Sequence, residues 1–388
     1  MTAKRNRRAG VEDLWHKSGG SPSKLNGTGF RWRARYVDDE NREHTKRFRT
    51  KPEAVKHLDE ITTSQVTGTY VAPQAGLATV EVIHGQWSAA QGHIKATTAA
   101  TRAVTWKTHV GDRWGTVAVA QVQTSAVRAW VAELVDHGAN PATVENALGV
   151  LRMTLDLAVE DRRLSRNPCT GVKAPRRQHR QRGYLTHRQV EELAQAVRSD
   201  PEVIRFLAYT GLRWGEMAAL KVENFDMLRR RVSVVQGVAE VQGRLVWSTA
   251  KNHERRSVPF PAFLTEQLAA AMVGKARGDL VFTSPEGQVL RVSSYRPRVF
   301  NGAVKICQSH SDGFPKVTPH DLRHTAASLA ISAGANVKGV QLMLGHKSAA
   351  LTLDTYADLF PDDLEAVAEA LNVAALAAAA YSLRTGEQ

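Results

Sequence analysis

A short motif near the C-terminal end carries side chains that could hold an anion. In residues 318–325 (TPHDLRHT), Thr318 and Pro319 predict a helix start, with the threonine as its cap and the proline in its first turn. His320 and Arg323 are three residues apart, so we expect them on one face at the positive end of this helix. Anions bind readily at such positions. By itself, however, a His-x-x-Arg spacing is also frequent by chance.

Four further polar side chains stand where the pattern predicts breaks or ends of elements. Arg213 follows a glycine between two expected helices, Lys251 lies in a polar turn between two expected strands, and His346 follows the glycine of an expected helix end. Tyr356 comes ten residues after His346. A phenol can act as a nucleophile and a lysine as a proton donor. Each residue alone is also explained as a surface charge, a loop lysine, a cap or a half-buried aromatic.

A metal or nucleotide site is not supported by the sequence. His320 and His324 have the spacing of two metal ligands on a helix, but the acid of an HExxH pair and a nearby third ligand are missing. The chain also lacks a GxxxxGK[ST] phosphate loop and an acidic cluster. We therefore expect no cofactor and no metal.

The elements that would position these residues are predicted from residue 184 onward. Thr186 and Gln189 form a capping box before an amphipathic helix. A second helix is expected over 201–209, and three short alternating strands over 232–236, 244–248 and 256–260. Helices are expected again from residue 318. Residues 184–388 thus read as a mainly helical domain with a small antiparallel sheet.

The first 67 residues predict a small sheet with an arginine-lined face. Residues 29–37 alternate aromatic or apolar residues with Arg31, Arg33 and Arg35, and we expect a helix over 52–63 to cover the apolar side. A second strand over 43–49 brings three more cations, namely Lys46, Arg47 and Arg49. Such a face could read a DNA groove. An edge hairpin protected by charge is the alternative.

Between this unit and residue 184, the pattern predicts a helical domain and a basic linker. Apolar residues recur at helical spacing within 77–172, where Asn140 and Pro141 begin a helix. Residues 173–183 contain proline and glycine without periodicity, which is typical of a linker. Nine lysines and arginines but no acidic residue occur over 162–188. Its cations could lie along phosphates, and we expect contacts from Arg176, Arg177, Arg180 and Arg182.

Composition agrees with a cationic multidomain protein. The chain has 388 residues and a formal net charge of +14, and its length predicts two or three domains. Nucleic acid is the commonest partner of such a charge, although an inert cationic surface is the alternative. The sequence has no long apolar run, so we expect a soluble cytoplasmic protein without a membrane partner. Cys169 and Cys307 form no CxxC motif and predict no disulfide scaffold.

Taken together and in this order, the motifs resemble the catalytic domain of the tyrosine recombinase (phage integrase) family. The matching stretches are TGLRWGE, the turn lysine, TPHDLRHT, LGH and LTLDTYAD, which span residues 210–358. The resemblance implies a multidomain fold, mainly α with small antiparallel β-sheets. It implies an arm-type DNA-binding domain over 1–67, a helical core-site domain over 77–172, a linker over 173–183 and the catalytic domain over 184–388.

The resemblance also implies roles for the six polar residues. Tyr356 would be the nucleophile that forms a covalent 3′-phosphotyrosine, without metal or ATP. Arg213 and Arg323 would hold two phosphate oxygens, a task for which guanidinium groups are suited. Lys251 would protonate the leaving 5′ oxygen. His320 would take the tyrosine proton or hold a phosphate oxygen, and His346 would be a further donor.

The function implied is DNA integration and, with accessory factors, excision of a phage or mobile-element genome in a bacterial host cell. The expected partners are duplex DNA with core and arm attachment sites, a homotetramer on DNA, a host DNA-bending protein and a directionality factor. We also expect residues 364–388 to form a helix that docks on a neighbouring protomer. Alternatives are a transposon-borne or chromosome-resolving recombinase, a catalytically silent DNA-binding regulator and, more distantly, a type IB topoisomerase.

Overall fold

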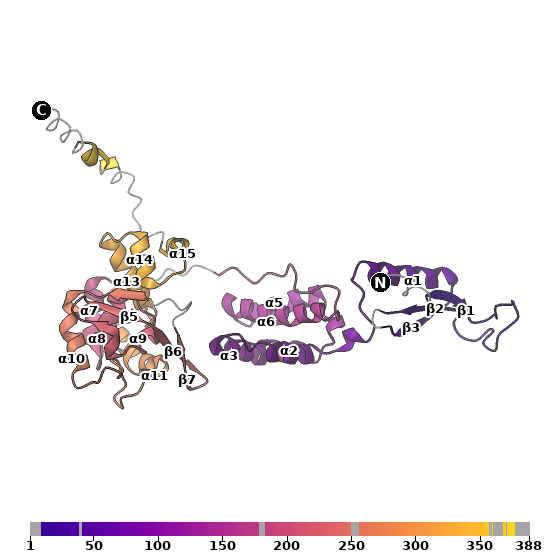
Figure 1. The fold of residues 1–388 in the computed structure, drawn as a ribbon, viewed down its shortest axis with the longest axis horizontal. Helices are drawn as coiled ribbons and strands as arrows, with labels where there is room; N and C mark the ends of the chain where they lie inside the picture. The colour runs from indigo at the N-terminus through magenta and orange to yellow at the C-terminus, as the bar shows by residue number, and fades with distance from the viewer. Residues whose placement is uncertain are drawn as a thin grey trace. The chain divides into compact units, whose positions relative to one another are not determined.

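The computed structural model describes residues 9–38, 41–177, 183–249, 256–356, 359, 368–369 and 371–376. The chain divides into two compact units, Met1–Gln178 and His179–Gln388. The first contains a small sheet and a set of helices, and the second is mainly helical with two small sheets (Figure 1). The expected fold class, mainly α with small antiparallel sheets, is confirmed.

The first unit begins with a three-stranded antiparallel sheet in the order β1-β2-β3. The strands are β1 (Gly10–Asp13), β2 (Trp32–Val37) and β3 (Glu43–Phe48), and helix α1 (Lys51–Val66) packs on one face. Ala34 and Tyr36 are buried beneath α1, as their alternation predicts. Strand β1 was not predicted, because its residues GVED lack an apolar alternation. β2 is therefore the central strand and no edge strand.

The rest of the first unit is helical. Its elements are η2 (Ala75–Leu77), α2 (Val80–Ala89), α3 (Ala96–Thr105), the π-helical η3 (Trp106–Val110), α4 (Gly111–Trp114), η4 (Val119–Gln121), α5 (Thr124–Asp136) and α6 (Pro141–Glu160). Asn140 caps α6 as predicted, because its side chain accepts the Thr143 N–H at 2.9 Å. Trp114, Leu151 and Leu155 lie in one buried apolar cluster, which holds these helices together.

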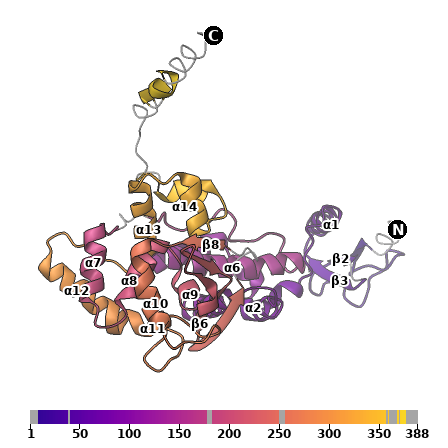
Figure 2. The same ribbon diagram turned by 60° about the vertical axis from the view of Figure 1, so that its left-hand side comes forward.

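Most of the second unit consists of helices around one large apolar cluster. They are α7 (His187–Ala196), α8 (Pro201–Thr210), α9 (Trp214–Met217), η5 (Val222–Asn224), η6 (Ala262–Leu264), α10 (Thr265–Met272), α11 (Val292–Tyr295), η7 (Arg296–Phe300), α12 (Asn301–His310), α13 (Asp321–Ser332), α14 (Val337–Leu344) and α15 (Ala349–Tyr356). The predicted capping box of Thr186 and Gln189 is present at the start of α7. Both views place α13 and α14 together (Figure 2), and α8 packs on α13.

The strands of the second unit form two sheets instead of the single one that we expected. β4 (Phe225–Asp226), β5 (Arg231–Val234) and β8 (Arg256–Pro259) make one sheet in the order β4-β5-β8. β6 (Gln236–Val241) and β7 (Arg244–Thr249) make a separate hairpin. The prediction missed β6 and did not separate it from β5, because residues 231–241 form an almost continuous β-prone run.

The predicted start of α13 was wrong by a few residues. His320, not Thr318, precedes the first helical residue Asp321. The cause is a turn over 318–321, which the Asp321 N–H closes by donating to the Thr318 carbonyl at 2.9 Å. The Asp321 carboxylate accepts hydrogen bonds from both the N–H and the hydroxyl of Thr318. These contacts stabilise the turn, and Thr318 does not cap the helix.

Candidate active site

Arg213 stands at the break between α8 and α9. The break depends on Gly211, whose φ of 65° lies in the left-handed region that glycine adopts without strain. Arg213 is the N-cap residue of α9, and its side chain is 40% exposed. The sequence predicted this placement from the glycine alone. The backbone therefore places the Arg213 guanidinium at the start of a helix, where part of it remains exposed to solvent.

Glu216 holds Arg213 through both its backbone and its side chain. The Glu216 carboxylate accepts the Arg213 backbone N–H at 2.9 Å and Nη1 of Arg213 at 2.8 Å. The carboxylate thus both supports the arginine and caps the local helix. Burial alone would raise the pKa of Glu216, but the hydrogen bonds and charge of Arg256 outweigh burial and lower it to about 2. The carboxylate is therefore ionised at neutral pH.

Arg323 is the buried arginine of the group, with 3% of its surface exposed. Its Nη1 donates to the Gly211 carbonyl at 2.6 Å, and its Nη2 to the Leu344 carbonyl at 2.6 Å. These carbonyls lie at the ends of α8 and α14, where the helix dipoles favour a cation. Burial, followed by the charge of Arg213, lowers the pKa of Arg323 to about 10, so it stays charged at neutral pH. The two bonds use two of its five N–H donors.

Tyr356 ends α15 with its phenol directed inward. Its side chain is 1% exposed and belongs to an apolar cluster that includes Ile331 and Leu344. The phenolic oxygen lies 2.7 Å from Nδ1 of His324, a hydrogen bond whose direction depends on the histidine tautomer. The sequence did not predict this contact. A signal existed in the four-residue step from His320 to His324, but it was interpreted only as a possible metal pair.

His346 lies beside both Tyr356 and the arginines. It follows Gly345, which ends α14 as predicted with a φ of 65°. The His346 ring is nearly parallel to that of Tyr356, with centroids 6.4 Å apart, and its Nδ1 lies 2.9 Å from the Thr352 hydroxyl. Burial, followed by the charges of Arg323, Arg213 and Arg256, lowers the pKa of His346 to about 4. The imidazole is therefore neutral at pH 7.

The remaining two predicted site residues are His320 and Lys251. The centroid of the His320 ring lies 5.2 Å from that of His324, whose own centroid lies 5.7 Å from that of Tyr356. Lys251 lies outside the described residues, although the strands that flank its turn, β7 and β8, are described. The structure thus brings Arg213, Arg323, His346 and Tyr356 together, and their catalytic roles remain predictions.

Electrostatically, this arrangement is suited to an anion. In addition to burial, the charges of Arg213 and Arg256 lower the pKa of Arg323, and the charges of all three arginines lower the pKa of His346. Arg213 and Arg256 share the carboxylate of Glu216. An anion between them would offset the remaining positive charge. Within the described ranges, no group of three or more His, Cys, Asp or Glu residues could hold a metal ion.

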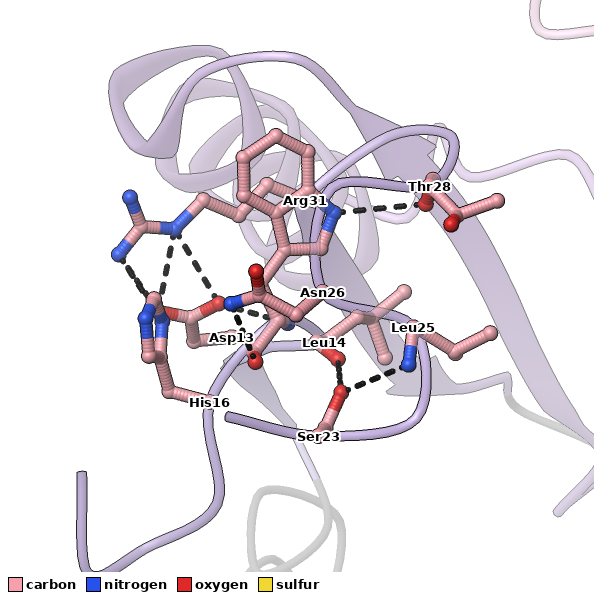
Figure 3. A network of polar contacts seen from close by, with 9 residues as sticks. Asp13, Leu14, His16, Ser23, Leu25, Asn26, Thr28 and Arg31 are labelled. Carbon is pink, nitrogen blue, oxygen red and sulfur yellow. Dashed lines mark hydrogen bonds and ion pairs between the residues drawn. The ribbon is translucent and has the colours of Figure 1, made fainter. Parts of the chain in front are cut away.

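Arg33 and Arg35 of β2 alternate with the buried Ala34 and Tyr36, and β1 supplies acidic partners to these two arginines and to Arg31, which precedes β2. Arg31 donates to Asp13 at 2.8 Å, and this hydrogen bond above all lowers the pKa of Asp13 (Figure 3). Nε of Arg33 donates to Glu12 at 2.9 Å, and Arg35 lies 3.3 Å from the same carboxylate. The predicted arginine face is therefore largely neutralised by residues of a strand that the sequence analysis missed.

The cations of β3 are divided between the two faces of the sheet. Arg47 is opposite Arg33 in the register and Lys46 is opposite the buried Ala34, so neighbouring residues point to opposite faces. Arg49 follows β3 and lies over the Phe30 ring at 5.7 Å. In the part of the chain that the structure describes, neither Arg47 nor Arg49 has an acidic partner within ion-pair distance.

The basic segment before residue 184 is described only in part. Arg177 pairs with Glu145 of α6 at 2.7 Å, with both side chains exposed, and Arg176 is exposed. Arg180 and Arg182 lie outside the described residues.

Of the helices in the described ranges, none combines the length and the apolar composition needed to traverse a bilayer.

Comparison with known proteins places these observations in one family. The model described as "Phage integrase family" matches residues 183–362. The integrase of Mycobacterium phage FRAT1 is 30% identical over 249 residues, which cover 62% of this chain and 72% of that protein.

Two solved structures show the same fold. The Tn1549 transposon integrase in complex with circular intermediate DNA has a TM-score of 0.66 and 21% identity, covering 76% of this chain and 100% of that one. A lambda integrase tetramer bound to a Holliday junction has a TM-score of 0.56 and 15% identity, covering 85% and 92%. The chain belongs to the phage integrase family of tyrosine-type site-specific recombinases.

Proposed function

We propose that this chain is a DNA integrase that cuts and rejoins duplex DNA through a covalent 3′-phosphotyrosyl intermediate on Tyr356. The observation that carries the proposal is the buried phenol of Tyr356, held by His324 beside His346. The guanidinium groups of Arg213 and Arg323 act on this same site, since both charges lower the pKa of His346. A nucleophile and two bidentate anion binders are the groups that phosphodiester transfer without metal requires.

In the first step, the Tyr356 oxygen attacks the scissile phosphorus and the bond to the 5′ oxygen breaks. The phenol proton passes to His324, whose Nδ1 is already at hydrogen-bond distance. Arg213 and Arg323 hold the two non-bridging oxygens, and neutral His346 donates a further hydrogen bond. Lys251 supplies the proton that the leaving 5′ oxygen needs, and His320 holds a phosphate oxygen.

In the second step, the 5′ hydroxyl of a partner strand gives its proton back to Lys251 and attacks the phosphotyrosyl phosphorus. The bond between Tyr356 and phosphorus breaks, and the phenol regains a proton from His324. One phosphodiester is thus exchanged for another, so no ATP is consumed.

The remaining assignments extend this proposal to the whole chain. We assign arm-site binding to residues 1–67, core-site binding to 77–172, a basic linker to 173–183 and catalysis to 184–388. Residues 364–388, few of which are described, would dock on a neighbouring protomer of a tetramer. A host DNA-bending protein and a directionality factor would assist integration and excision in the bacterial cytoplasm.

A transposon-borne recombinase is the second candidate, because the Tn1549 transposon integrase has the same fold. A plasmid assay in a bacterial host distinguishes the possibilities. A non-replicating plasmid carries the gene with its flanking DNA, and the junctions of the recovered insertions are sequenced.

Insertion at one bacterial site that depends on Tyr356 supports the integrase, and insertion at many sites supports a transposon enzyme. Relaxed circles without recombinants would point to a topoisomerase. DNA binding without any strand exchange, when wild type and Tyr356→Phe behave alike, would contradict the proposal and favour a regulator.

A further inference from the structure

Arg256 is a third arginine of the candidate site, and the sequence motifs did not point to it. It is the first residue of β8 and its side chain is 16% exposed. Its Nη1 donates to Oε1 of Glu216 at 3.0 Å, and its Nη2 donates to Oε2 at 2.5 Å. This is a two-bond arginine–carboxylate pair, the geometry that fixes orientation most strongly.

The same carboxylate is the one that holds Arg213. Glu216 therefore accepts four hydrogen bonds, two from Arg256 and two from Arg213. Without Arg256, the 14%-exposed Glu216 would lose half of these bonds and keep a single cationic partner. Its carboxylate could then rotate toward Arg213 and draw that guanidinium away from a phosphate.

Arg256 also contacts the loop that carries His346. A Cβ atom added to Gly345 would lie 3.0 Å from Cδ and Nε of Arg256 and 3.1 Å from its Cζ. A side chain at this position would require the guanidinium to shift by a few tenths of an ångström. One side chain from β8 thus touches both the carboxylate behind Arg213 and the end of α14.

We propose that Arg256 is a positioning residue that sets the orientation of Arg213 through Glu216, and with it the placement of the scissile phosphate. The inference rests on the proposed strand-transfer function. In this role Arg256 acts through Glu216 and not on the phosphate itself, since both of its hydrogen bonds among the described contacts go to that carboxylate.

The test uses the full chain and a duplex carrying the core site that the insertion junctions reveal. The duplex is nicked so that the covalent complex accumulates, and its formation rate is measured apart from DNA affinity. We expect Arg256→Met to slow the rate by about 10²-fold, the loss typical of a small misplacement of a reacting group, with affinity within about twofold. Arg256→Lys should recover part of the rate, because an ammonium keeps the charge but loses the two-bond geometry.

Arg231→Met is the matched control. Arg231 lies on the neighbouring strand β5, and its exposed side chain bonds only to the Ser257 hydroxyl among the described contacts, at 3.4 Å. Its loss should leave the rate unchanged. Thermal unfolding of each variant shows whether a slow rate reflects a damaged fold.

A second substrate separates positioning from general structural damage. In it, a methyl group replaces one non-bridging oxygen of the scissile phosphate, in the diastereomer on which Arg213→Ala loses least. If Arg256 acts through Arg213, the loss of rate caused by Arg256→Met should also be smaller on this substrate, as it is for Arg213→Ala. The double variant Arg213→Ala/Arg256→Met should also be no more than about threefold slower than Arg213→Ala alone.

Equal losses on both substrates, or multiplied losses in the double variant, would overturn the inference, as would a wild-type rate in Arg256→Met. A wild-type chain that forms no covalent complex at all would instead contradict the proposed function.

Discussion

The phenolic oxygen of Tyr356 lies 2.7 Å from Nδ1 of His324, one residue beyond the buried Arg323 on α13. The contact joins the proposed nucleophile to the same helix that supplies a phosphate-binding arginine. Because the phenol is 1% exposed, the bond forms in a largely dry environment, where it constrains the ring strongly.

His324 is therefore expected to matter for the attack and not for DNA binding. We predict that His324→Gln slows covalent complex formation by about 10²-fold, within the range for loss of a proton-transfer group. The rate is measured on the nicked duplex, and affinity by titration. The control is His310→Gln, since His310 is an exposed histidine at the end of α12. An unchanged rate in His324→Gln would show that the hydrogen bond has no part in the reaction.

Gly345 should tolerate no side chain. Its φ of 65° strains any other residue, and a Cβ would meet Arg256 at 3.0 Å. We predict that Gly345→Ala lowers the free energy of unfolding by at least about 1–2 kcal/mol. Gly339→Ala, in the same helix, should cost nothing or stabilise, because the nearest atom to its Cβ lies 3.5 Å away. Urea unfolding measures the free energy of unfolding of both variants, and equal values would contradict this prediction.

The stability of the fold should depend on pH through His346. Its folded pKa of about 4 lies below its value near 6.5 in an unfolded chain. Between these two values only the unfolded chain binds the proton. The contribution of the neutral His346 to the free energy of unfolding is therefore fully present above about pH 6.5 and falls as the pH drops toward 4. Compared with wild type, His346→Asn should lose less stability between pH 7 and pH 5. Identical changes in the urea midpoint of both proteins would contradict this.

The N-terminal sheet should contact DNA mainly through Arg47 of β3 and Arg49, which follows that strand. Because Arg33 and Arg35 already pair with Glu12, we predict that Arg47→Ala/Arg49→Ala lowers the salt dependence of arm-site binding more than Arg33→Ala/Arg35→Ala does. Glu12→Gln should raise DNA affinity, since it frees two arginines. Affinity measured over a range of salt concentrations tests both statements. If Arg33→Ala/Arg35→Ala has the larger effect, this prediction is wrong and the arginines of β2 are the main contacts with DNA.

Much of the second unit could be predicted because its breaks are marked locally. Gly211 and Gly345 end helices in the left-handed conformation, and Thr186 caps α7, as the sequence indicated. Such signals depend on one or two residues and their neighbours. They are sufficient to predict that Arg213 and His346 stand at the ends of elements.

The partners of these residues could not be predicted in the same way, because they come from distant parts of the chain. Arg256 meets Glu216 across 40 positions, and Arg33 meets Glu12 across 21. Each pairing depends on how strands and helices pack, which the periodicity of one segment does not reveal. His324 was overlooked for another reason. Its spacing to His320 raised only the question of a metal pair, which the rest of the sequence did not support, and a contact with Tyr356 was not considered.

The most direct test of the central claim is to isolate the covalent complex and locate the modified residue. Wild-type protein and Tyr356→Phe are incubated with the nicked core duplex, the DNA is digested, and the peptides are examined by mass spectrometry. We predict a nucleotide attached through a 3′ phosphate to Tyr356 in the wild type, and no adduct in the variant at nearly unchanged DNA affinity. An adduct on another residue, or strand cleavage retained by Tyr356→Phe, would contradict the account.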